Sequence, residues 1–156
     1  MMLFYFQRLV EIFPFFLKGL WMTAAVSGIS LIAATIFGLL LGIARASESK
    51  LLVGLIGAYV AVIRGTPFVV QIFIIFFILP EWGIQLDAFP AAILALTILG
   101  TAFICEIVAG GIKAVPKGQW EAASSSGLNI YQQLRYVIVP QSLQTILPPW
   151  WDSMCC

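Results

Sequence analysis

The chain has 156 residues, of which 62% are hydrophobic and only 10% are charged, and its mean hydropathy is +1.04. Soluble domains are about half apolar and about a quarter charged, so this composition excludes a soluble domain and predicts an integral membrane protein. The net charge of +1 argues against nucleic-acid binding, which needs clustered Lys and Arg. The absence of His argues against a His-based active site or metal site. No cofactor is expected.

The first predicted membrane span covers residues 19–44, which carry no charge. About 20 apolar residues are needed to cross the hydrocarbon core. Small residues recur at every fourth position, and the stripe contains a GxxxG pattern that lets another helix approach closely. Such stripes also occur by chance in Gly- and Ala-rich spans, but we expect this one to mark a helix contact. Its members are Ser30, Ala34, Gly38, Gly42 and Ala46.

The second predicted span, residues 51–79, is interrupted near its middle by Arg64-Gly-Thr-Pro67. Proline has no amide hydrogen and disfavours helical geometry at the preceding residue, here Thr66. We therefore expect a kink or a break at this point. Gln71 follows seven residues after Arg64, about two helical turns further along the same face.

The third predicted span covers residues 89–112 and follows a loop that contains two acidic residues but neither Lys nor Arg. Cytoplasmic loops are enriched in Lys and Arg. Both the link 45–50 and the segment 113–135 carry such residues. We therefore expect these two regions to lie in the cytoplasm and the N-terminus to lie outside.

Two ionised side chains fall at membrane depth, Arg64 at the interruption of the second span and Glu106 in the third. Each costs roughly 2.5–3.5 kcal/mol at the centre of a span, so such residues face a partner or a wet cavity. Broken spans expose backbone groups to a cavity near mid-membrane. One interpretation is that Arg64, Gln71 and Glu106 line a polar substrate path. The other is that Arg64 and Glu106 pair, or satisfy backbone groups, in a static bundle.

The segment 113–135 is polar and predicts two short cytoplasmic helices. The first contains Trp120-Glu-Ala-Ala123 and should stop at Gly127 in the left-handed conformation. The second should begin at Asn129, an N-cap whose capping-box partner is Gln132.

Apolar residues of the second short helix are expected to hold it against the membrane domain. The first helix would then present its own side chains to a partner in a docking contact, although an ordinary surface loop that folds back is the alternative. The residues expected to face the membrane domain are Leu128, Ile130, Tyr131 and Leu134, and those expected to face a partner are Trp120, Glu121, Ala122 and Ala123.

The spacing of Glu121-Ala122-Ala123, Gly127 and Val137-Ile-Val-Pro140 resembles the EAA signature of the permease subunits of ABC importers. Two Val residues stand where the family usually has Ile and Leu. Further motifs resemble the polar amino-acid branch of these permeases, which includes histidine- and glutamine-type proteins. These motifs are Arg64-Gly-Thr-Pro67, Val70-Gln71, Cys105-Glu-Ile107, Gly110-Gly-Ile112 and Gly118-Gln119.

The resemblance implies an all-α, multi-pass transmembrane helical bundle of the importer permease type, forming one domain over residues 1–156 in a bacterial inner membrane. It is expected to carry a polar amino acid and to be no enzyme itself, because ATP hydrolysis is expected on cytoplasmic ATP-binding subunits. The other expected partners are a second permease subunit, identical or different, and an extracytoplasmic amino-acid-binding protein.

The resemblance also assigns residues. The ATPase-coupling motif would comprise Glu121, Ala122, Ala123, Gly127 and Pro140. The candidates for the translocation region are Arg64, Thr66, Pro67, Gln71 and Glu106.

The chain departs from the family at two places. Ala109 stands where the family usually has Arg, and the ending Trp150-Trp-Asp-Ser-Met-Cys-Cys156 does not resemble the family. The last apolar stretch, residues 136–151, is interrupted by three prolines and predicts only a partial span. We therefore expect a domain truncated at the C-terminus. The alternative function is that of a non-functional truncated permease fragment with only an interaction role.

Overall fold

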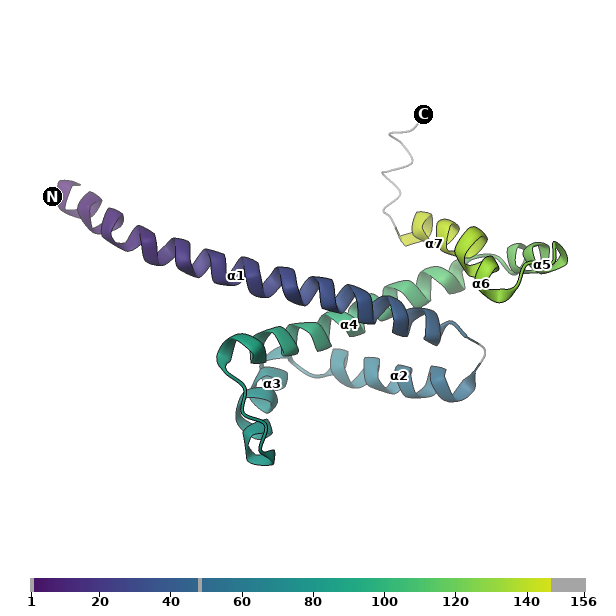
Figure 1. Cartoon of the computed structure of the whole chain (residues 1–156), viewed down its shortest axis with the longest axis horizontal. Coiled ribbons are helices and arrows are strands. Elements are labelled where there is room, and N and C mark those ends of the chain that lie inside the picture. The colour runs from purple at the N-terminus through teal and green to yellow at the C-terminus, as the bar shows by residue number, and fades with distance from the viewer. Residues whose placement is uncertain (1, 48, 147–156) are drawn as a thin grey trace.

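The computed structural model describes residues 2–47 and 49–146, and every regular element within them is a helix (Figure 1). The predicted all-α fold class is therefore confirmed. The longer helices are α1 (Met2–Arg45), α2 (Lys50–Gly65), α4 (Ala88–Ala114) and α5 (Lys117–Ser125). The shorter ones are α3 (Phe68–Phe73), α6 (Ile130–Gln133) and α7 (Val139–Ile146), with π or 3-10 turns at η1 (Ile74–Ile78), η2 (Leu79–Trp82) and η3 (Leu134–Ile138).

Two of the described helices are long and apolar enough to cross a membrane, Ile12–Arg45 and Ala88–Ala114. A third crossing is formed if the bent pair Lys50–Gly65 and Phe68–Trp82 counts as one span. The two halves of this pair differ in direction by 102°. Thr66 lies between them with extended backbone angles, φ −98° and ψ 131°, so the break expected at Pro67 is confirmed.

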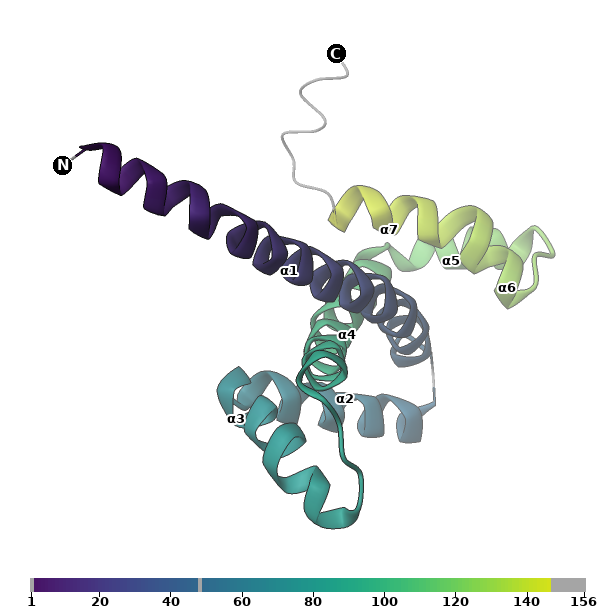
Figure 2. The same ribbon diagram turned by 60° about the vertical axis from the view of Figure 1, so that its left-hand side comes forward.

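Helices α1 and α4 cross along the small-residue stripe of α1 (Figure 2). A Cβ atom built on Gly38 would lie 2.6 Å from the Cβ of Ile104, and one built on Gly42 would lie 2.6 Å from the Cβ of Val108. Any larger residue at these two positions would push the helices apart, because ordinary carbon–carbon contacts are about 3.5–4.0 Å. The stripe is therefore a true helix contact, as expected.

Helix α2 packs against α4 and also contacts α1. The hydroxyl of the partly buried Tyr59 donates a hydrogen bond of 2.8 Å to the carbonyl of Ile98, which gives the phenol a polar partner within the protein. Next to this bond lies a small apolar core formed by Ile56, Val60, Ala102 and Cys105.

The C-terminal part of the described chain, α5 to α7, lies against the end of α4, on the side away from the helix break (Figure 1). It is held there by a buried apolar cluster that contains Ile112 of α4, Val115 directly after α4 and Ile138 of η3. We call α5, α6, η3 and α7 the α5–α7 unit. Of the predicted partial span 136–151, residues 147–151 lie outside the described residues.

Candidate functional site

The two charges predicted at membrane depth lie together, and a third charged residue joins them. Glu106 on α4 forms an ion pair and hydrogen bond through its Oε2 atom with Nη1 of Arg45, the last residue of α1. Nη1 of Arg64, in the last turn of α2, lies 3.5 Å from the same oxygen. We call these three residues the charge cluster. It connects α1, α2 and α4 through one carboxylate.

The two arginines of the charge cluster are held differently. The Arg45 side chain is 19% exposed, whereas the Arg64 and Glu106 side chains are each 42% exposed. At 3.5 Å, Arg64 is beyond the usual length of an N–H···O hydrogen bond, and its guanidinium carbon lies 5.2 Å from the centroid of the Phe103 ring. Such a position gives a cation–π attraction. Arg64 is thus the more accessible and more loosely paired cation.

The charge cluster contains two guanidinium groups and one carboxylate, so its net charge is +1 when all three are ionised. One further anionic group can therefore be accommodated beside Arg64 with favourable electrostatics. The predicted pairing of Arg64 with Glu106 is present in the structure. The role of either residue in a substrate path remains a prediction.

Gln71 stabilises the helix break. Its Nε2 donates hydrogen bonds to the carbonyl of Ile63 at 2.7 Å and to the carbonyl of Thr66 at 3.0 Å. The last carbonyls of a helix have no partner within the helix, and leaving them unpaired at membrane depth costs several kcal/mol. The hydroxyl of Thr66 donates to the carbonyl of Val62 at 2.7 Å. The break is thus supplied with donors from two side chains.

The position expected for Gln71 was wrong in one respect. The sequence pattern placed it two turns further along the face that carries Arg64, which requires a continuous helix. Because the chain bends by 102° at the break, Gln71 instead returns to the last turn of α2. It is 6% exposed, and its amide serves the backbone.

Arg45 is the member of the charge cluster that sequence reasoning missed. From the sequence, Arg45 indicates only the orientation of the link that follows the first span. A usable signal was present, because Arg45 directly precedes Ala46, the last member of the small-residue stripe. A stripe that contacts α4 brings its neighbouring residue within side-chain reach of the same helix.

The turn after α5 has the predicted left-handed glycine. Gly127 has φ +77°, its N–H donates to the carbonyl of Ser124 at 3.0 Å, and the N–H of Leu128 donates to the carbonyl of Ala123 at 3.3 Å. These two bonds form a Schellman motif, the common end of a helix at glycine. The predicted stop is therefore confirmed.

The predicted capping box at the start of α6 is also confirmed. The Asn129 side chain accepts a hydrogen bond from the N–H of Gln132 at 2.9 Å, and the Gln132 side chain accepts one from the N–H of Asn129 at 2.9 Å. Gln133 is buried, and its Nε2 donates to the carbonyl of Leu128 at 2.7 Å. The path of the chain between α5 and α6 is thus fixed by side-chain hydrogen bonds.

Helix α5 presents only part of the face expected. Glu121 and Ala122 are exposed, but Ala123 is buried and Trp120 packs against the apolar cluster at the end of α4. The indole is the largest apolar group of this helix, and burying it yields more hydrophobic free energy than exposing it. The expectation that Ala123 faces a partner was therefore wrong, and Trp120 is only partly exposed.

Helix α6 shows the opposite error. Ile130 and Tyr131 were expected to contact the membrane domain, yet each is 64% exposed. The reason is that α6 is only four residues long and turns Gln133 inward to bond the Leu128 carbonyl. Leu134 does contact the cluster, as expected.

Pro140 is placed at the start of α7 after a π-helical turn. The N–H of Val139 donates to the carbonyl of Leu134, a bond that spans five residues. Pro140 has no N–H to donate to the carbonyl four residues earlier, and a π turn is one way in which a helix adapts locally to a missing bond. The proline of the EAA-like motif therefore coincides with a change of helix type.

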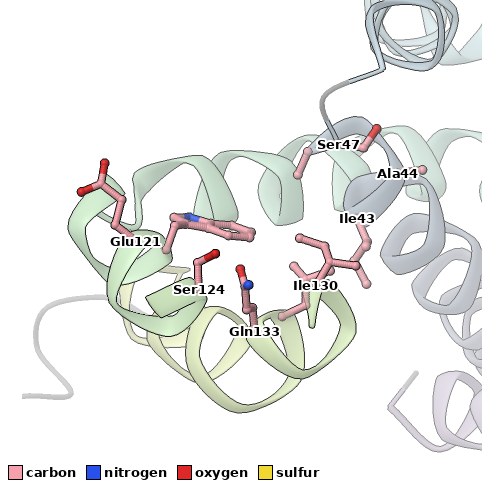
Figure 3. A pocket seen from close by; sticks show the side chains of 10 residues that line it. Ile43, Ala44, Ser47, Glu121, Ser124, Ile130 and Gln133 are labelled. Carbon is pink, nitrogen blue, oxygen red and sulfur yellow. The ribbon is translucent and has the colours of Figure 1, made fainter. Parts of the chain in front are cut away.

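A cavity of about 810 Å³ separates the end of α1 from the α5–α7 unit. In Figure 3 Ser124 and Gln133 point towards this space, whereas the carboxylate of Glu121 points away from it. Glu121 is therefore presented on the outer side of α5. The cavity is lined by Ile43, Ala44, Ala46, Ser47, Trp120, Glu121, Ser124, Ile130, Gln133 and Leu134.

Residues 34–150 match the family described as "Binding-protein-dependent transport system inner membrane component". The chain is 41% identical over 140 residues to a probable amino-acid ABC transporter permease protein of Bacillus subtilis (strain 168), an alignment that covers 90% of the chain and 62% of the relative. It is 42% identical over 139 residues to a probable glutamine ABC transporter permease protein of the same organism, covering 89% and 64%.

Among solved structures, the chain resembles one described as "Crystal structure of an amino acid ABC transporter with histidines". The TM-score is 0.79, the identity is 37%, and the match covers 92% of this chain and 67% of that one. The chain thus spans somewhat less than two thirds of the length of the two Bacillus relatives. The resemblance predicted from the EAA-like motif is confirmed, and the chain belongs to the family of binding-protein-dependent transport system inner membrane components.

Proposed function

We propose that the chain is the membrane-spanning permease part of an ABC transporter that imports polar amino acids across the inner membrane. The observation that carries the proposal is the charge cluster beside a broken span. An amino acid carries a carboxylate and an ammonium group, and the cluster offers charges of both signs, of which Arg64 and Glu106 are each 42% exposed. Similarity to amino-acid and glutamine permeases supports this class of solute. In this proposal Thr66, Pro67 and Gln71 maintain the break that gives the solute access to Arg64 and Glu106.

The α5–α7 unit is the proposed coupling site for cytoplasmic ATP-binding subunits, on which ATP is hydrolysed. Glu121 and Ala122 are exposed on α5 and would contact the ATP-binding subunit directly. Ala123 is buried, and Gly127 and Pro140 shape the backbone, so these three would support the contact from behind. A second permease subunit and an extracytoplasmic binding protein complete the proposed assembly.

Transport can be tested in proteoliposomes that contain the full chain, its partner ATP-binding subunits and its binding protein. Uptake of radiolabelled L-glutamine, L-arginine, L-cystine and L-histidine is measured with ATP and with a non-hydrolysable ATP analogue. We expect uptake of at least one of these amino acids that depends on ATP hydrolysis. Absence of uptake for all four would overturn the proposed transport function and favour the non-functional fragment.

Coupling can be tested separately by exchanging one charge. Glu121→Lys is compared with Glu81→Lys, an exposed carboxylate in η2 on the far side of the helix break. In a pull-down of the ATP-binding subunit from detergent, we expect recovery to fall several-fold for Glu121→Lys and to stay at the wild-type level for Glu81→Lys. Equal recovery for both variants would count against α5 as the coupling helix.

A further inference from the structure

Both arginines of the charge cluster lie close to the same oxygen atom of Glu106. Nη1 of Arg45 and Nη1 of Arg64 both contact Oε2 of Glu106. The Arg45 contact meets the criteria of a hydrogen bond, whereas Arg64 remains 3.5 Å away. Two cations that approach one carboxylate oxygen compete for it and also repel each other. The occupied position beside Glu106 is therefore a reason why Arg64 forms an ion pair with Glu106 but no direct hydrogen bond.

The surroundings of the two arginines agree with this difference, in which Arg45 is hydrogen-bonded to Glu106 and Arg64 is not. Arg45 is the less exposed of the two, at 19% against 42%, and a charge-assisted hydrogen bond becomes stronger away from water. Arg64 is in the last turn of α2, next to the break that Gln71 stabilises. Its guanidinium lies over the ring of Phe103, which leaves its N–H groups at the edge of the guanidinium plane for an anion.

We propose that Arg45 is a positioning residue: it holds the Glu106 carboxylate so that Arg64 stays available for the carboxylate of the transported solute. This inference rests on the proposed function for the identity of the solute. The competition between the arginines rests on geometry alone. If Arg45 is removed, Glu106 turns to Arg64 and closes the 3.5 Å gap, so that the solute must displace an internal carboxylate.

The first readout does not need transport. Phenylglyoxal modifies accessible arginines, and mass spectrometry of the full chain in membranes gives the extent of modification at Arg64 relative to Arg135, which lies in η3 away from the charge cluster. In Arg45→Gln we expect modification of Arg64 to fall at least about threefold. In the double variant Arg45→Gln/Glu106→Gln it should return to the wild-type level, because the competing carboxylate is gone.

The second readout is the KM for the amino acid of the four-member panel that the wild type takes up. We expect Arg45→Gln to raise KM about tenfold and the double variant to reverse most of that rise. Arg45→Lys keeps a cation beside Glu106 and should stay within about threefold of the wild type in both readouts. A purely structural role for Arg45 makes the double variant at least as defective as the single one.

The results separate the two proposals. Unchanged Arg64 modification in Arg45→Gln, or no recovery in the double variant, would overturn the positioning role whatever the transport data show. Lack of uptake by the wild type would overturn the proposed function, while the modification experiment would still decide between competition and no competition for Glu106.

Discussion

The contact between α1 and α4 offers the most direct test of how this chain folds. We predict that Gly38→Ala destabilises the protein, because the added Cβ atom would lie 2.6 Å from the Cβ and 2.7 Å from the Cγ2 of Ile104. Carbon atoms in contact prefer about 3.5–4.0 Å, so the helices must separate by about 1 Å. A gap of that size forfeits about a quarter to a half of the dispersion attraction across the contact. Overpacking of this kind costs about 1–3 kcal/mol.

The matched control is Gly28→Ala, in the same helix and with nothing within 4 Å of the added Cβ. It should be neutral or stabilising by up to about 1 kcal/mol, because alanine favours the helix over glycine. The assay is the equilibrium unfolding of both variants and the wild type in mixed micelles of mild detergent and sodium dodecyl sulfate. If Gly38→Ala and Gly28→Ala unfold at the same detergent fraction, the close approach of α1 and α4 at Gly38 is wrong.

Three further predictions concern the backbone of the break and of the α5–α7 unit. Gly127→Ala should lower the free energy of unfolding by about 1 kcal/mol or more, because φ is +77° there. The control is Gly118→Ala in α5, where nothing lies within 4 Å of the added Cβ, and it should be neutral or stabilising. Equal effects of the two variants in the same assay would contradict the strained turn. Asn129→Ala removes the capping box and should lower the free energy of unfolding by about 1 kcal/mol, while Asn129→Asp keeps an acceptor and most of the stability. We expect the backbone amide of Gln132 to exchange its hydrogen faster in the Ala variant but not in the Asp variant. Gln71→Leu leaves the carbonyls of Ile63 and Thr66 without their side-chain donor and should lower the free energy of unfolding by about 1–3 kcal/mol. The variant should therefore unfold at a lower fraction of sodium dodecyl sulfate in mixed micelles. An unfolding midpoint equal to that of the wild type would mean that the break does not need Gln71.

Local patterns in the sequence predicted several features of the structure correctly. The break at Pro67, the small-residue stripe of α1, the left-handed Gly127 and the Asn129 capping box are each indicated by residues that are close in sequence. For such features the physical cause, a missing amide or an absent Cβ, is visible in the residue itself.

The features that were not predicted from the sequence depend on the path of the chain after a bend. Gln71 was misplaced because the 102° change of direction could not be read from Pro67 alone. Arg45 was missed because its partner Glu106 is 61 residues away. The buried and exposed sides of α5 and α6 were predicted only in part. They are determined by the apolar cluster at the end of α4, against which Trp120 and Leu134 pack. The expectation of a non-functional fragment rested on the last residues, 147–156, which lie outside the described part of the chain.

The buried cluster of Ile112, Val115 and Ile138 has a mechanical consequence. It joins α5 and η3 to the end of α4, a helix of 27 residues that is about 40 Å long. Glu106 is on the same helix, six residues before Ile112, or about 9 Å along its axis. If α5 is the coupling helix proposed above, a displacement of α5 would therefore reach the end of a helix that also carries the carboxylate. In the proposed coupling, this single helix would link the α5 surface to the charge cluster.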